Sequence, residues 1–383
     1  MQTDYNINGR AAIGSAIVLG TLGVLSFIVQ PALVQGFVTH LHIGEAAAVN
    51  LAGLEMLGVA IATIVLAIPR FVFNWRRLLA VGIGLAVVGN LASAALVDSA
   101  NLWVARLIAG LGHGAIISLS FTFIGLTARV ERNVALYLVA LLTYGALGLW
   151  IMPALLSAIG LKGLFIVFAC LAAFGLLTLK HVPVSASVRD EVGPNGRQLR
   201  ASLLATALVG VLFYNLAQGI AWAILFLVGI DAGMGEQDVA TALFISQIFA
   251  IFGALGSVFL SERLGRRGAI AFGILAGAAC IALLLGRPSY TYFLIGVCGF
   301  NLLWNFVLPF ILAAVGDFDL RGRMMGPAIA MQMLGLGGGP LLAAQLIEGG
   351  TYRVAELVCI GFFIASYIFL TLPMFRHRQL LKS

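Results

Sequence analysis

The sequence consists of long apolar segments separated by short polar loops. Most segments are about 20 residues or longer, which is enough for an α-helix to cross a hydrocarbon core of about 30 Å. They do not alternate polar and apolar positions as the strands of a membrane β-barrel do. The pattern predicts an all-α membrane protein with twelve transmembrane helices. The predicted segments are 11–38, 46–69, 78–97, 101–128, 134–159, 161–179, 203–230, 238–260, 268–286, 289–315, 324–347 and 354–375.

The composition supports a membrane protein and argues against several other classes. Of the 383 residues, 61% are hydrophobic and 10% are charged, whereas soluble domains carry about 25% charged residues. The chain has no nucleotide-binding P-loop and no hydrolase or metalloprotease motif, so we expect neither an ATP-driven step nor an enzyme. The four cysteines stand singly in apolar segments, so no disulfide framework and no metal site is predicted, and no cofactor is expected.

The loop charges predict an orientation in the membrane. Most of the 22 lysines and arginines lie in one set of loops and in the two tails. Loops rich in basic residues remain on the cytoplasmic side, so both termini are expected to be cytoplasmic. This distribution also explains the formal net charge of +7 without a nucleic-acid partner.

One polar segment is long enough to separate two domains. Residues 181–200 carry two prolines and mixed charge, and we predict that they form a cytoplasmic linker. The predicted domains are an N-terminal six-helix bundle over 1–180 and a C-terminal six-helix bundle over 201–383.

Basic residues recur at matching places in the two halves. Arg76 and Arg77 precede the third segment, and Arg266 and Arg267 precede the ninth. Similarly, one arginine precedes the fifth segment and one the eleventh. This spacing favours a duplicated six-helix unit, as in many secondary transporters. Chance remains the alternative, because cytoplasmic loops collect basic residues in any case.

Three residues that can carry a charge lie well inside apolar segments, away from their ends. They are Glu55 in the second segment, and Arg106 and His113 one heptad apart in the fourth. An ionised group in hydrocarbon costs from about 3 to more than 10 kcal/mol, so such residues usually have a function. Arg106 is near enough to a helix end to extend to the membrane surface instead. His113 could be a structural residue or a proton carrier.

The second half supplies polar and aromatic residues without charge, near the middle of the predicted helices. Alternating-access transporters bind substrate at this depth. Hydrogen bonds between helices are the alternative explanation for many of the amides. The candidate substrate-binding residues are Tyr214, Asn215, Gln218 and Trp222 in the seventh segment, Gln247 in the eighth, Asn301, Trp304 and Asn305 in the tenth, Gln332 in the eleventh, and Gln30 and Tyr144 in the first half.

The loop between the eighth and ninth segments contains a family-like motif. It reads Glu262-Arg263-Leu264-Gly265-Arg266-Arg267 and resembles the signature loop of the major facilitator superfamily. The resemblance implies a gating loop, with a carboxylate that pairs across a helix seam and a glycine that permits the turn. In the first-half counterpart only the basic pair remains, since valine and tryptophan stand at the acidic and glycine positions.

The fourth segment carries a second family-like motif. Leu102, Arg106, Gly110 and Gly112 fit L-x-x-x-R-x-x-x-G-x-G, and His113 follows. The pattern resembles that of proton-coupled antiporters in the same superfamily, most of all compact bacterial drug and sugar efflux permeases. Alanine stands where the family often has glutamine, before the first glycine. The resemblance implies that Arg106 takes part in proton transfer.

The resemblance also implies an arrangement for the buried charges. The second and fourth helices are neighbours in that fold, so Glu55 and Arg106 are expected to pair beside His113. The pair could be a permanent structural ion pair. Alternatively, a carboxyl that moves between apolar and cationic surroundings can bind and release a proton.

The implied protein has two pseudo-symmetric six-helix bundles in a bacterial cytoplasmic membrane. It would export a small organic molecule in exchange for protons by alternating access, as a monomer surrounded by lipid. Proton-coupled import and facilitated diffusion use the same fold, so they remain alternatives. A membrane sensor or lipid-handling protein that transports nothing is a third alternative.

Overall fold

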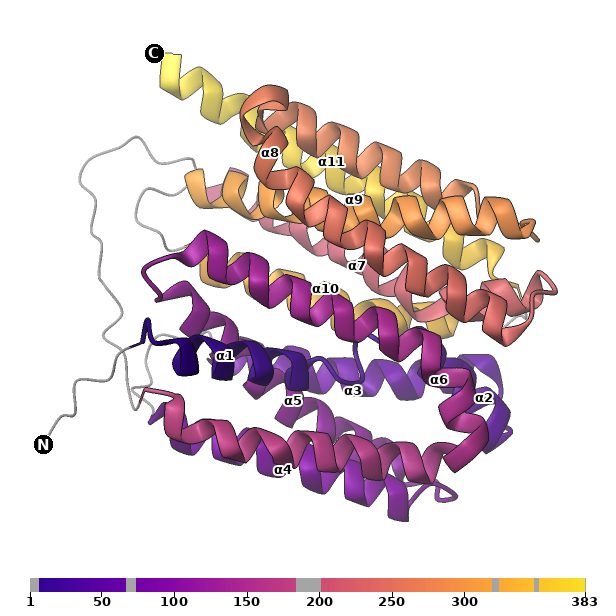
Figure 1. Ribbon diagram of the computed structural model, residues 1–383. Coiled ribbons are helices and arrows are strands. Elements are labelled where there is room, and N and C mark those ends of the chain that lie inside the picture. Colours follow the sequence, from indigo (N-terminus) through magenta and orange to yellow (C-terminus); the bar gives the residue numbers. More distant parts are fainter. Residues whose placement is uncertain (1–6, 67–73, 184–200, 319–323, 348–350, 383) are drawn as a thin grey trace, which may run out of the picture. The chain divides into compact units, whose positions relative to one another are not determined.

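The computed structural model describes residues 7–66, 74–183, 201–318, 324–347 and 351–382, and it divides the chain into two compact units, Met1–Val188 and Arg189–Ser383. The predicted linker over 181–200 falls mostly outside the described residues. In the described part the regular elements are all helical (Figure 1). The first unit contains α1 (Arg10–Gly23), α2 (Gln30–Leu41), α3 (Glu45–Leu66), α4 (Trp75–Ala95), α5 (Leu102–Gly125), α6 (Val130–Phe174) and the 3-10 helix η1 (Gly175–His181). The second contains α7 (Ala201–Asp231), α8 (Glu236–Ala282), α9 (Tyr290–Asp317), α10 (Met325–Leu346) and α11 (Arg353–Lys382).

The twelve predicted crossings are confirmed, although two pairs are joined into single long helices. Helix α6 contains a non-helical residue at Gly160, with φ 63°, and α8 contains one at Gly265, with φ 62°. Both torsions lie in the left-handed region that glycine adopts at little cost. The chain turns back at these points, as Figure 1 shows for α6 close to α2. Each long helix therefore supplies two antiparallel crossings. The turn at Gly160 lies between the predicted segments 134–159 and 161–179, and the turn at Gly265 lies between 238–260 and 268–286.

The first crossing is not the continuous helix predicted over 11–38. It is interrupted between α1 and α2, where residues 24–29 form turns. Pro31 lies in the first turn of α2 and explains the interruption, because its ring would collide with the carbonyl of Phe27 in a continuous helix. Backbone groups that lose their helical hydrogen bonds here have other partners. The Tyr144 hydroxyl of α6 donates to the carbonyl of Leu25 at 2.7 Å. Such replacement bonds make broken helices tolerable at membrane depth.

The basic pairs that suggested a repeat make the same kind of contact in both units. Arg76, at the start of α4, donates to the carbonyls of Val182 at 2.5 Å and Lys180 at 3.2 Å, at the end of the sixth crossing. Arg267, at the start of the ninth crossing, donates to the carbonyl of Met374, near the end of the twelfth. Arg76 thus bonds carbonyls in the last turn of η1 and directly after it, where the helix offers no N–H partner. Arg267 bonds a carbonyl near Pro373 of α11. The matched bonds support the pseudo-symmetry of the two bundles.

Replacing Arg76 with glutamine is expected to lower the stability of the protein. The change removes charged hydrogen bonds to two carbonyls, and a bond of this kind contributes about 1.5–3 kcal/mol. The adjacent Arg77 has an exposed side chain, so Arg77→Gln is the matched control and should be nearly neutral. Thermal unfolding of the purified variants in detergent measures both effects. Equal unfolding midpoints for the two variants would contradict the assignment.

Candidate functional site

The three ionisable residues singled out in the sequence lie together inside the first unit. Glu55 comes from α3, and Arg106 and His113 come from α5; their relative exposures are 2%, 0% and 1%. Arg106 does not extend to the membrane surface, so that alternative is wrong. One carboxylate and one guanidinium are therefore held together in an apolar bundle, where neither is tolerated alone.

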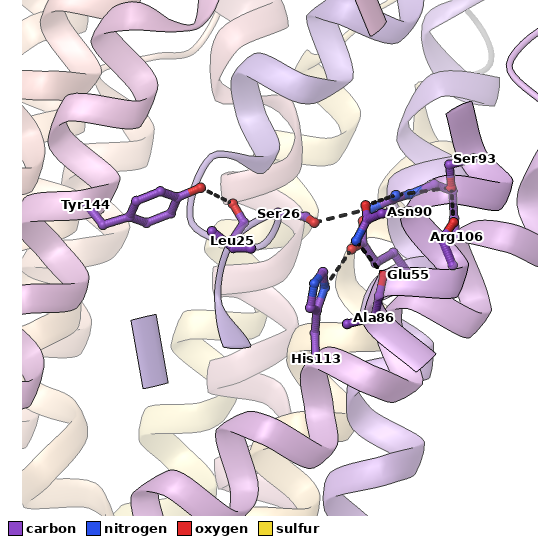
Figure 2. Close-up of polar contacts among 10 residues, drawn as sticks. Leu25, Ser26, Glu55, Ala86, Asn90, Ser93, Arg106, His113 and Tyr144 are labelled. Carbon is purple, nitrogen blue, oxygen red and sulfur yellow. Dashed lines mark hydrogen bonds and ion pairs between the residues drawn. The ribbon is translucent and has the colours of Figure 1, made fainter. Parts of the chain in front are cut away.

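Arg106 is the centre of the cluster, and Figure 2 shows the polar groups that bond it. One terminal nitrogen donates to Asn90 Oδ1 at 3.0 Å and to Ser93 Oγ at 3.3 Å, both on α4. The other donates to Ser26 Oγ at 3.2 Å and to the carboxylate of Glu55. The Phe165 ring, in the second arm of α6, lies 4.7 Å from the guanidinium carbon and adds a cation–π contact.

His113 completes the cluster on the opposite side of the carboxylate. Its Nδ1 lies 3.2 Å from Glu55 Oε1, so each oxygen of Glu55 has its own nitrogen partner. Two other nitrogens have no hydrogen-bond partner among the described atoms, Nε2 of His113 and Nε of Arg106. The site therefore retains unused hydrogen-bonding capacity directly beside the ion pair. This is unusual for a purely structural network, in which buried polar atoms are satisfied.

Glycines in α5 bring the neighbouring backbones close enough to build the cluster. A Cβ at Gly110 would collide with the carbonyl of Glu55 itself on α3. A Cβ at Gly112 would lie 2.5 Å from the carbonyl of Gly82 on α4. The spacing R-x-x-x-G-x-G thus presents one glycine to each neighbouring helix. Small residues allow this close approach where lipid provides no hydrophobic drive for helix association.

The sequence did not identify three polar partners of Arg106, namely Ser26, Asn90 and Ser93. All three are buried. Asn90 and Ser93 also bond their own helix, to the carbonyls of Ala86 and Gly89. Their three-residue spacing inside an apolar segment was a usable signal, because it places both on one helix face. Ser26 carried no such signal, since it lies in the interruption of the first crossing.

The aromatic residues predicted to bind substrate meet inside the second unit. The rings of Trp222 on α7 and Trp304 on α9 lie 6.0 Å apart at 71°. Asn301 donates to Ser246 Oγ of α8 at 2.9 Å, and Asn305 donates to the carbonyl of Asn301 at 3.0 Å. Asn301 is therefore used in a bond between helices, which was the alternative explanation for these amides, whereas the bond of Asn305 lies within α9.

Other predicted residues of this set have different surroundings. Tyr214 accepts from Gln218 Nε2 at 2.7 Å and packs its ring against Phe363 of α11. Asn215 donates to the carbonyl of Val211 on its own helix. The amide oxygens of Asn215, Gln218 and Gln247 are buried without a hydrogen-bond partner. Gln332 is buried on α10, while Gln30 and Tyr144 belong to the first unit.

The predicted gating loop is described only in part. Gly265 makes the turn inside α8, as the motif required. Arg266 donates to the carbonyl of Ala313 on α9 at 3.4 Å, and Arg267 to Met374, within the same unit. The side chains of Glu262 and Arg263 lie outside the described residues. In the part of the chain that is described, no group of three or more His, Cys, Asp or Glu residues could hold a metal ion.

Comparison with known proteins identifies the fold. Residues 15–318 match the family model described as Major Facilitator Superfamily. A mutant of the nucleoside transporter NupG has a TM-score of 0.73 at 12% identity, covering 94% of this chain and 98% of that one. The Major Facilitator Superfamily transporter FucP, in the outward conformation, has a TM-score of 0.61 at 14% identity, again covering 94% and 98%. No curated protein matches the sequence.

Gly110→Ala is expected to distort the buried cluster. The added methyl would meet backbone atoms of Glu55, which cannot rotate away, so α3 must move and carry its carboxylate from Arg106. Overpacking of this kind costs about 1–3 kcal/mol. Gly84→Ala on α4 is the control, because nothing lies within 4 Å of its added Cβ. Thermal unfolding should separate the two variants, and a Gly110→Ala protein as stable as the control would show that the backbones are not in contact.

Proposed function

The chain belongs to the major facilitator superfamily and is a secondary transporter, and we propose that it exports a small organic molecule in exchange for protons by alternating access. Glu55 is the residue assigned to proton coupling, with Arg106 and His113 controlling its charge. The observation that carries the proposal is the burial of all three in one cluster with unused hydrogen-bonding atoms. The export direction rests on the resemblance of the fourth helix to that of the family's antiporters.

The geometry supports a carboxyl whose charge depends on its neighbours. With Arg106 and His113 beside it, Glu55 is stabilised in the ionised form. If the helices separate, the carboxylate loses its partners inside an apolar bundle and must take up a proton. Proton binding is thereby linked to the packing of α3 against α5. A linkage of this kind lets a proton gradient drive a conformational cycle.

The interrupted first crossing offers a route from the cluster to the rest of the unit. Arg106 bonds Ser26 inside the interruption, and Tyr144 of α6 bonds the preceding residue, Leu25. Figure 2 shows both bonds on the same short segment. A non-helical segment can change conformation without breaking the backbone hydrogen bonds of a helix. Release of Arg106 from Glu55 would therefore free the segment between α1 and α2 to move.

The proposed substrate surface in the second unit is formed by Trp222, Trp304, Asn301 and Asn305. Indole rings stack on flat apolar or cationic groups, and amides orient a polar group. Few charges are available there, so the surface suits a small organic molecule without multiple charges. Tyr214, Asn215, Gln218, Gln247 and Gln332, with Gln30 and Tyr144 of the first unit, complete the proposed set.

The location and the gate are proposed on the sequence pattern. Basic loops favour both termini in the cytoplasm, and the resemblance favours a monomer in a bacterial cytoplasmic membrane. The loop Glu262–Arg267 is proposed to control opening on the same side, with Gly265 as its turn.

Glu55→Gln is expected to uncouple transport from protons. Glutamine imitates the protonated carboxyl permanently, so exchange of substrate across liposomes should continue, whereas accumulation driven by a pH gradient should be lost. Glu45→Gln is the control, since Glu45 begins the same helix and lies outside the cluster. His113→Ala should shift the pH dependence without abolishing transport.

Liposome flux with gradients of either orientation distinguishes the outcomes. Full pH-driven accumulation by Glu55→Gln would refute the assignment of Glu55. Loss of substrate binding as well as coupling would make Glu55 a substrate ligand. If substrate accumulates in the same direction as the protons flow, rather than in the opposite direction, the protein is an importer and not an exporter.

Trp304→Ala is expected to weaken substrate binding more than tenfold, which corresponds to about 1.4 kcal/mol. A ligand is first identified by a thermal-shift screen of the purified protein. Trp103→Ala on α5 is the control, because that indole is 46% exposed on the outside of the first unit. Undiminished affinity in both Trp304→Ala and Asn305→Ala would exclude this surface as the substrate site.

A further inference from the structure

Among the described residues of the second unit, Glu356 is a buried carboxyl that the proposed function does not use. Glu356 lies in the first turn of α11 and is 2% exposed. Both of its oxygens are buried without a hydrogen-bond partner. The backbone N–H of Gly286 lies close to the carboxyl, but neither oxygen makes a bond with it that meets ordinary distance and angle limits. Glu356 thus differs from Glu55, both of whose oxygens are paired.

The surroundings of Glu356 are apolar. It borders a cavity of about 10 Å³, which is otherwise lined by aliphatic side chains of α7, the end of α8 and the following loop, and by Cys359. The Cys359 thiol donates to the carbonyl of Ala217 at 3.2 Å. A metal cation needs several oxygen ligands, and these walls do not provide them. The ligand that fits the site is a proton.

The charged groups near Glu356 do not favour its ionised form. The carboxylate of Asp231, at the end of α7, would repel a negative charge on Glu356. Arg287 bonds Asp231 at 3.3 and 3.4 Å with its own side chain 75% exposed, so its charge is directed to Asp231. Arg353, one turn earlier on α11, is exposed to the surroundings of the protein.

The helix terminus does not change this balance. A negative charge near a helix N-terminus gains about 0.3–1 kcal/mol from the aligned peptide dipoles. An ionised carboxylate buried without a partner loses several kcal/mol. The second effect is larger, so the neutral acid is the stable form in this arrangement.

We propose that Glu356 is a proton-binding site of the second unit, separate from Glu55, and that its proton is bound and enclosed in this conformation. The carboxyl holds the proton by an O–H bond, and the proton can leave only when the packing of α11 against α7 opens. The proposal does not depend on the transport function above, because a bound proton is detected on the purified protein without substrate.

Infrared spectroscopy of the purified protein at neutral pH, as the difference between the spectra of the wild type and each variant, tests the proposal. A protonated carboxyl in dry surroundings has a C=O stretching band that a carboxylate lacks. The band is expected in the wild-type protein, in Glu55→Gln, and in Glu236→Gln, which replaces an exposed acid of the same unit. It should be lost in Glu356→Gln. A band of full intensity in Glu356→Gln, or no band in the wild type, would overturn the assignment.

Stability provides a second readout with a defined sign. Above about pH 5 the folded protein would hold one proton that the unfolded chain does not, because an exposed glutamate ionises near pH 4.3. Wild-type stability relative to Glu356→Gln should therefore fall as the pH rises from about 5 to about 8. A constant difference in unfolding midpoint over this range would contradict a bound proton.

The glutamine variant also guards against a folding artefact. Glutamine has the shape and charge of the protonated acid, so Glu356→Gln should fold at least as well as the wild type. Failure of this variant to fold would itself count against the neutral form. The Glu356→Asp variant retains the acid and should keep a carboxyl band at a shifted frequency; an unshifted band would assign the signal to another residue.

Discussion

The first unit is organised around the need to neutralise one fully buried guanidinium. Arginine cannot lose its charge in a protein, so Arg106 must be surrounded by acceptors wherever it is buried. The interrupted first crossing, α3 and α4 each supply at least one acceptor, and α6 supplies an aromatic ring. Loss of any of these elements leaves a buried charge with fewer partners. The packing of the unit and the charge of Glu55 are therefore parts of one equilibrium.

Close backbone contact is what makes this neutralisation possible. The guanidinium reaches acceptors on neighbouring helices because α5 meets α3 at Gly110 and α4 at Gly112 with no side chain between. Larger residues would separate the helices and leave space that only lipid or water could fill. The glycines and the arginine consequently act as one motif. The glycines set the distance from α5 to α3 and α4, and at that distance the arginine reaches its acceptors.

Much of the fold could be predicted from hydropathy alone, but the interruption in the first crossing could not. Apolar segments report only whether a residue suits lipid, and residues 24–29 suit lipid whether or not they are helical. Pro31 was a local signal for a break, yet its position depends on which carbonyls find other donors. Tyr144 provides one of these donors from more than a hundred residues away. A contact of this range leaves no mark in the periodicity of either segment.

The meeting of Glu55 with Arg106 could be anticipated because two ionisable residues in apolar helices need each other. Glu356 escaped notice for the opposite reason: it lies near a segment end, where a carboxylate in the sequence looks exposed. The structure buries it at 2% exposure and gives its oxygens no partner. Two carboxyls of the same type thus lie in opposite electrostatic surroundings, one beside a guanidinium and an imidazole and one in an apolar pocket. Environments of this kind drive like groups toward different protonation states. If both sites exchange protons, they would do so in response to different movements: α3 against α5 for one, and α11 against α7 for the other.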